Sequence, residues 1–260
     1  MNRRSTLKWL GAVALGVSLP ATVSQSTELV SLAVIAPDEP DHLPLQTESV
    51  VCRVIGVGDA GRNILLAAWS SGLLQAKHCR AEFACVNMGR KSTRAVSKAN
   101  RLNPGITPVK SVQLARFGAG SNVKVARTAA RKHDKALRSL MDGADVVILV
   151  AGLGGGTGSG VSPILAGMAR EAGALAFAVV VTPFSWELGR YPNAFQAVKE
   201  LERECDYLAS LSNQTVGEEL GEDATLDDVV TQQKLMGAAC IRRLMVDGSR
   251  FCIDRRSRPT

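Results

Sequence analysis

From residue 50 onward, short apolar runs alternate with longer amphipathic stretches. The apolar runs have the length of strands and are bounded by glycine, proline or polar residues; they lie at 50–54, 81–86, 146–150, 174–181 and 207–211. The amphipathic stretches have helical spacing and lie at 62–71, 90–99, 121–141, 192–204 and 225–246, with a further helix opening at Ser162-Pro163. Strands that alternate with helices predict an α/β fold, with a doubly wound, mostly parallel sheet and helices on both faces.

Two glycine-rich loops each follow a strand and precede a helix. The first, residues 56–61, reads GVGDAG and matches the G-x-G-x-x-G pattern, whose glycines let the backbone approach a pyrophosphate. The second, residues 151–160, reads AGLGGGTGSG and follows the most apolar strand. Glycine is costly to order, so this run indicates backbone at positive φ or close to a ligand. Its amides and the hydroxyls of Thr157 and Ser159 predict a polyphosphate site.

The second loop is not a Walker A sequence, because no lysine follows Gly158. Residues 154–160, GGGTGSG, resemble instead the glycine signature of the FtsZ/tubulin family, with Ser159 in place of a threonine. Further loops and strands resemble that family in the same order, at 54–63, 83–87, 117–122, 143–145 and 182–187. The resemblance spans about residues 50–254 and implies GTP or GDP as the ligand, with Mg²⁺ as a candidate cofactor.

By this resemblance the phosphates lie on the loops at 118–122 and 154–160, Glu187 holds the ribose, and Gln233 stands where the family reads the base. The nucleotide-binding residues that it implies are Gly58, Asp59, Gly61, Arg62, Asn63, Gly118, Ala119, Gly120, Asn122, Gly154, Gly155, Gly156, Thr157, Gly158, Ser159, Gly160, Glu187, Arg190, Asn213 and Gln233.

Hydrolysis in this family uses carboxylates that a second subunit supplies from the loop after its long central helix. Asp254 is the only counterpart, since residues 255–258 read RRSR where another acid is expected. The family also continues beyond the position of Thr260 into a second domain that supplies filament contacts. We therefore expect a GTP-binding protein, at most a weak GTPase, that co-assembles with or regulates a cytoskeletal filament in bacterial cell division.

Several positions depart from the family pattern around the expected ligand. Asp59 places an anion beside the phosphates, which Arg62 or a metal would have to offset. Met88 and Gly89 replace a Thr-Asp pair, and Val229 stands where an aromatic ring would stack on the base. These departures keep open a degenerate, non-hydrolysing interaction module. A third reading, an NAD(P)-binding protein that uses residues 56–61 with Arg90 and Lys91 near a 2′-phosphate, leaves the second glycine loop unexplained.

The chain divides into a signal-like apolar segment (1–24), a proline-containing linker (25–49), the nucleotide-binding domain (50–254) and a basic tail (255–260). Arg3 and Arg4 precede an apolar run at 9–19, the shape of a twin-arginine export signal that is too short to span a bilayer. A misassigned start codon or a loose apolar tail explains this run equally well. The six cysteines form no CxxC pair and predict reduced thiols in a cytoplasmic protein. Export or membrane association is the alternative.

The net charge of +7 arises largely from basic residues between 90 and 138. Such a face could contact an anionic membrane or nucleic acid, but no nucleic-acid-binding motif accompanies it. We therefore favour a solvated basic face. The remaining partners implied by the resemblance are guanine nucleotide and an FtsZ-like filament or a second copy of the chain.

Overall fold

A computed structural model describes residues 49–74 and 79–256, and within these ranges six strands form one sheet in the order β3-β2-β1-β4-β5-β6. Every neighbouring pair is parallel, which confirms the predicted α/β class. The strands are β1 (Val50–Val57), β2 (Cys79–Asn87), β3 (Val109–Gln113), β4 (Val146–Gly152), β5 (Leu175–Thr182) and β6 (Tyr207–Ser212).

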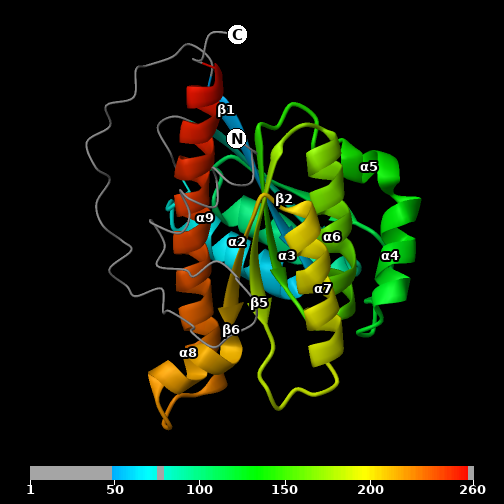
Figure 1. Ribbon diagram of the computed structural model, residues 1–260, viewed down its shortest axis with the longest axis vertical. Coiled ribbons are helices and arrows are strands. Elements are labelled where there is room, and N and C mark those ends of the chain that lie inside the picture. Colours follow the sequence, from blue (N-terminus) through cyan, green and yellow to red (C-terminus); the bar gives the residue numbers. More distant parts are fainter. Residues whose placement is uncertain (1–48, 75–78, 257–260) are drawn as a thin grey trace.

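Helices cover both faces of the sheet (Figure 1). They are α2 (Gly58–Ser70), α3 (Arg90–Leu102), α4 (Val123–Lys132), α5 (Asp134–Arg138), α6 (Gly156–Glu171), α7 (Tyr191–Glu204), α8 (Asn213–Leu220) and α9 (Leu226–Arg256). The core on one face joins the sheet to α2, α3 and α9, and includes Cys52 and Val54 of β1. The core on the other face joins it to α4, α5, α6 and α7, and includes Ile55 and Val57. Strands buried on both faces have near-continuous apolar sequences, as the runs from residue 50 onward show.

The strand order reverses between β1 and β4. From β1 the chain moves outward through β2 and β3, and then returns to pair β4 on the other side of β1. Loops that leave β1 and β4 therefore run to opposite sides, which opens a crevice at the carboxyl edge of the sheet. The two glycine-rich loops meet there, since a Cβ on Gly58 would lie 3.4 Å from the backbone nitrogen of Gly158.

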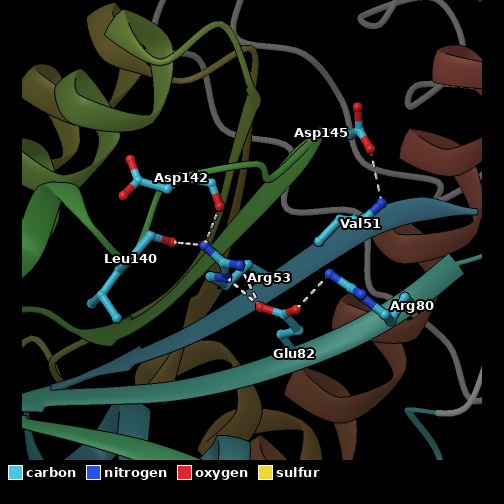
Figure 2. Close-up of polar contacts among 7 residues, drawn as sticks. All are labelled: Val51, Arg53, Arg80, Glu82, Leu140, Asp142 and Asp145. Atoms are coloured by element: carbon cyan, nitrogen blue, oxygen red, sulfur yellow. Dashed lines mark hydrogen bonds and ion pairs between the residues drawn. The ribbon is translucent and has the colours of Figure 1, made fainter.

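A buried arginine ties together the amino-terminal edge of the sheet (Figure 2). Arg53 on β1 is only 7% exposed and forms an ion pair with Glu82 on β2. It also donates to two backbone carbonyls within residues 140–142, just before β4. Beside it, the carboxylate of Asp145 accepts a hydrogen bond from the backbone nitrogen of Val51 at 2.8 Å. These bonds join β1, β2 and the start of β4 at the edge opposite the crevice.

Two elements were not predicted. The strand β3 lies at an edge of the sheet and is mostly polar, with Val109 as its one fully buried residue, so it lacks the apolar run of a central strand. The helix α8 likewise buries only Val216, and its start is fixed by a hydrogen bond from the backbone of Thr215 to the Ser212 hydroxyl. Contacts with neighbouring elements therefore stabilise both β3 and α8, and neither has a hydrophobic pattern strong enough to predict it from sequence.

Several predicted helices have different bounds, and three of these differences change the interpretation. The helix expected over 121–141 breaks at His133, which leaves the helical conformation between α4 and α5. The helix expected to open at Ser162 begins six residues earlier, inside the glycine loop. The last helix continues to Arg256, so Asp254 and the first two residues of the expected basic tail belong to α9.

The signal-like segment, the linker up to residue 48 and the tail from residue 257 lie outside the described residues. None of the helices that the structure describes is long and apolar enough to cross a membrane.

Candidate functional site

A cavity of about 660 Å³ opens at the carboxyl edge of the sheet. Its walls are the loops that follow five of the strands, together with the start of α8, and its volume falls in the range of small-molecule sites. The predicted residues that line it are Gly58, Asp59, Gly118, Ala119, Gly120, Gly155, Gly156, Thr157, Gly158, Glu187, Arg190 and Asn213. The structure therefore gathers residues from 58 to 213 around one space.

Three helices begin at this cavity without a side-chain cap. The first residues of α2, α3 and α6 all line it, and no side chain accepts a hydrogen bond from their opening turns. The first N–H groups of a helix have no acceptor within the helix, and the helix dipole adds positive potential there. Helix starts that converge on one cavity form a site for an anion such as a phosphate.

Most glycines of the second loop are required by close packing. A Cβ on Gly158 would lie 2.0 Å from the carbonyl oxygen of Gly152, and one on Gly156 would lie 2.8 Å from the Cβ of Ala119. Both glycines are helical, so α6 can begin directly against the end of β4 and the neighbouring loop. Within residues 154–160, Gly154 is the position with positive φ, at 97°. Small residues thus bring the opening turn of α6, with its free amides, into the cavity wall.

Other predicted site residues shape these loops from behind the cavity wall. The buried Ser159 hydroxyl accepts a hydrogen bond from the backbone nitrogen of Gly154 at 2.8 Å. Asn122 caps α4 through its side-chain oxygen. Gly61 and Gly160 sit where a Cβ would meet neighbouring backbone atoms at 2.0 and 3.0 Å. These four residues are outside the cavity lining and hold the loops in place.

The anion that the first loop introduces is already paired. The carboxylate of Asp59 accepts hydrogen bonds from Arg62 at 2.7 Å and from Asn87 at 2.9 Å. Arg62 in turn donates to the side-chain oxygen of Asn63 at 2.8 Å. Arg62 thus supplies the compensating charge that the sequence requires beside Asp59, while its own side chain lies outside the cavity lining.

The loop after β5 supplies a second paired acid. Glu187 forms an ion pair with Arg190 at 2.8 Å, and its other carboxylate oxygen accepts a hydrogen bond from the backbone nitrogen of Phe184 at 3.0 Å. Both paired side chains line the cavity. Mg²⁺ at nucleotide sites is commonly held by one or two carboxylates together with phosphate oxygens. Asp59 and Glu187 are the carboxylates of this lining that could coordinate Mg²⁺.

Gln233 has an unusual environment. It is 3% exposed on α9, and within the described part of the chain neither its side-chain nitrogen nor its side-chain oxygen has a hydrogen-bond partner. It does not line the cavity wall. A buried unsatisfied amide is costly, so Gln233 is a candidate contact for a ligand that has hydrogen-bond donors and acceptors of its own.

Asp254 lies far from this site. Its helix neighbour Arg256 forms an ion pair with Asp145 at 2.7 Å, and Asp145 marks the amino-terminal edge of the sheet. The cavity is at the opposite edge. Asp254 is exposed, on a helix rather than on the loop that the resemblance implied.

The lining also contains polar residues that were not in the predicted set. They are Asn87, Arg90, Lys91, Ser92, Arg116, Ser121 and Thr182. In the sequence interpretation, Arg90 and Lys91 were contacts of an NAD(P) phosphate and members of the basic face at 90–138. Their position directly after a strand of a parallel sheet is the signal that could have placed them at the cavity.

Comparison with known proteins agrees with this architecture. Residues 51–220 match the family model described as Tubulin/FtsZ family, GTPase domain. The chain belongs to the tubulin/FtsZ family. Cell division protein FtsZ of Buchnera aphidicola is 32% identical over 183 residues, which cover 70% of this chain and 45% of that protein. FtsZ of Pseudomonas aeruginosa is 32% identical over 182 residues, covering 69% of this chain and 43% of the relative. The chain thus spans less than half the length of these curated relatives.

Solved structures of the tubulin/FtsZ type share the fold. The empty FtsZ dimer of M. jannaschii superposes with a TM-score of 0.64 at 24% identity, covering 77% of this chain and 55% of that one. A GTPγS-bound protofilament of CetZ2 from Haloferax volcanii gives a TM-score of 0.60 at 22% identity, covering 77% of this chain and 59% of the other.

Proposed function

We propose that this tubulin/FtsZ family member binds a guanine nucleotide, GTP or GDP, in the cavity at the carboxyl edge of its sheet. The observation that carries the proposal is the convergence of three uncapped helix starts with the second glycine loop on one cavity. This arrangement presents many N–H donors, and the glycines of the second loop leave them accessible, which suits a polyphosphate.

Different residues of the site would contact the phosphates, the ribose and the base. The backbone amides of residues 118–120 and 155–158 bind the phosphates. Glu187, which is paired with Arg190, contacts the ribose. We further propose that the base reaches the buried amide of Gln233, which lies outside the cavity lining and has no hydrogen-bond partner among the described residues. Val229, 3% exposed and one turn earlier on α9, provides an apolar surface for base packing.

Among the residues that the structure describes, the cavity lining contains no acid other than the paired Asp59 and Glu187 with which to orient an attacking water. We therefore propose that hydrolysis by one molecule is weak or absent, and that the chain acts by co-assembling with, or regulating, an FtsZ-type filament in cell division. Relatives such as the Pseudomonas aeruginosa protein are themselves cell division proteins.

Thermal unfolding with separate additions of GTP, GDP, ATP and NADPH tests the ligand. A ligand at 100 times its Kd stabilises the folded state by about 2.7 kcal/mol, so GTP and GDP should raise Tm by several degrees while ATP and NADPH should not. Stabilisation by NADPH alone would favour the dinucleotide alternative. No shift with any of them would favour a non-binding interaction module.

Phosphate release by the chain alone and its co-sedimentation with FtsZ together test the role in a filament. The chain alone should release phosphate from GTP at close to the uncatalysed rate. Adding purified FtsZ should bring the chain into sedimenting filaments in a GTP-dependent manner. Failure to co-sediment, with nucleotide binding intact, would refute co-assembly and leave the ligand assignment standing.

A further inference from the structure

Three cationic side chains line the cavity on two neighbouring segments, since a Cβ on Gly89 would lie 3.7 Å from the backbone nitrogen of Gly118. Arg90 and Lys91 are the first two residues of α3, and Arg116 belongs to the loop between β3 and α4. All three are exposed, and within the described residues none of them forms an ion pair with a carboxylate. Arg116 lies over the ring of its neighbour Phe117, 5.6 Å from the ring centre. We call these three residues the cationic arc.

The position of Arg90 and Lys91 at the start of α3 lowers the stability of that helix. The start of a helix carries positive potential, so acids stabilise it and cations destabilise it. The first turn of α3 has no acid and instead begins with two adjacent cations. Residues that lower the stability of the fold, such as two cations at a helix start, are expected at functional sites.

Two other basic residues of the 90–138 segment have structural roles. Arg127 of α4 pairs with Glu200 of α7, and Arg138 pairs with both Asp134 and Glu171. The other basic residues of this segment lie outside the cavity lining, whereas the arc lies on the cavity and has no ion-pair partner among the described residues, so a general solvated basic face does not account for its position. Its charge is available to a ligand.

The charges that face the cavity are unbalanced. Its two lining carboxylates, Asp59 and Glu187, are each paired with an arginine. The three cations of the arc therefore remain uncompensated, next to the helix starts that already favour an anion. A nucleoside triphosphate would meet this excess with its terminal phosphate, the most highly charged part of the ligand.

We propose that Arg90, Lys91 and Arg116 bind the terminal phosphate of the nucleotide and compensate its charge without a divalent cation. This proposal rests on the proposed binding of guanine nucleotide. Arginine can contact a phosphate through two parallel N–H groups, and lysine acts as a point charge. The arc makes the site selective for GTP over GDP, and its contribution weakens as salt screens the exposed charges.

Calorimetric titration of GTP and GDP, in Mg²⁺ and separately in EDTA, tests the arc. The unaltered protein should bind GTP with Kd values within about threefold of each other in the two buffers. The double variant Arg90→Ala, Lys91→Ala should lose at least tenfold in GTP affinity in EDTA, and threefold or less in GDP affinity. Its thermal stability without nucleotide should stay equal or rise, because two cations leave the start of α3.

The matched control is Lys98→Ala, Arg101→Ala, which removes the same charge from exposed positions of α3 outside the cavity. This control should bind both nucleotides like the unaltered protein. The arc is refuted if GTP binding by the unaltered protein falls more than tenfold in EDTA, or if the two double variants behave alike. In either case binding of GTP and GDP would still support the proposed function, whereas binding of neither nucleotide in either buffer would refute both.

Discussion

At the scale of single residues, the space beside each glycine of the second loop decides where α6 begins. Gly158 has no room for a methyl group, because the carbonyl oxygen of Gly152 occupies that position at 2.0 Å. Gly155, three residues earlier, has open space around it and an ordinary φ of −83°. The same residue type therefore serves two purposes within one turn. Gly158 permits packing, and Gly155 leaves the cavity open.

Gly158→Ala should destabilise the protein by about 3 kcal/mol, because the backbone of β4 or α6 must move to admit the methyl group. Gly155→Ala is the matched control and should change the free energy of unfolding by no more than about 1 kcal/mol, the cost of alanine at a helix N-cap. Urea denaturation of both variants measures the difference. Equal losses would contradict the packing role of Gly158.

Gln233→Leu should stabilise the protein without nucleotide by about 1 to 2 kcal/mol, since it removes a buried amide that has no partner. It should also reduce the preference for GTP over ATP at least tenfold, because the base then loses its hydrogen bonds. Gln232→Leu, at the adjacent half-buried position, is the control and should alter neither quantity by a comparable amount. Unchanged base preference in Gln233→Leu would remove Gln233 from the site.

At the scale of elements, the Arg53–Glu82 ion pair joins β1 to β2 at the edge opposite the cavity. Burial by itself would raise the pKa of Glu82, but the hydrogen bonds and charge of Arg53, with the charges of Arg80 and Lys110, hold that pKa below its ordinary value of 4.5. The carboxylate is therefore ionised more readily in the folded than in the unfolded chain. Its stabilising contribution is complete above the unfolded pKa and is lost as the pH falls through the folded pKa.

The free energy of unfolding should accordingly fall as the pH drops below about 4.5, the ordinary pKa of this carboxyl group. Glu82→Gln should lower stability at pH 7 and flatten this acid dependence, because the residue no longer titrates. Glu222→Gln, an exposed position between α8 and α9, serves as the control. Chemical denaturation from pH 3 to pH 7 measures both, and an unchanged acid slope in Glu82→Gln would contradict the role of this ion pair.

At the scale of the whole molecule, α9 separates the cavity from Asp254. Its 31 residues correspond to about 45 Å at 1.5 Å per residue. Its end is anchored at the amino-terminal edge of the sheet by the ion pair between Arg256 and Asp145. Asp254 therefore cannot reach the cavity of its own molecule, and any catalytic role for it requires the cavity of a neighbour.

If Asp254 acts in this way, phosphate release per molecule should rise with protein concentration and vanish on dilution. Asp254→Asn should abolish the concentration-dependent part and leave nucleotide affinity unchanged, because it lies outside the cavity. A GTPase assay across a hundredfold range of concentration measures this. A rate per molecule that is constant over that range would rule out hydrolysis in trans.

The sequence alone determined the central strands, the two glycine loops and the family, because these features are local. Strands buried on both faces require unbroken apolar runs, and a loop whose backbone packs closely against its surroundings requires glycine. Gly58 and Asn213, both assigned to the nucleotide site by the family resemblance, line the same cavity. The pairing of Asp59 with Arg62 is local too, since the two residues lie three apart on α2, whereas the start of α6 depended on which atoms the fold brings together.

Only the tertiary structure showed that β3 completes an edge, that Ser159 turns inward, and that Gln233 is buried without a partner. The same is true of the placement of Arg90 and Lys91 on the cavity wall. Each of these outcomes depends on residues far apart in the chain. A polar edge strand or an exposed cation has no distinctive local pattern, so its role becomes visible only when its neighbours in space are known.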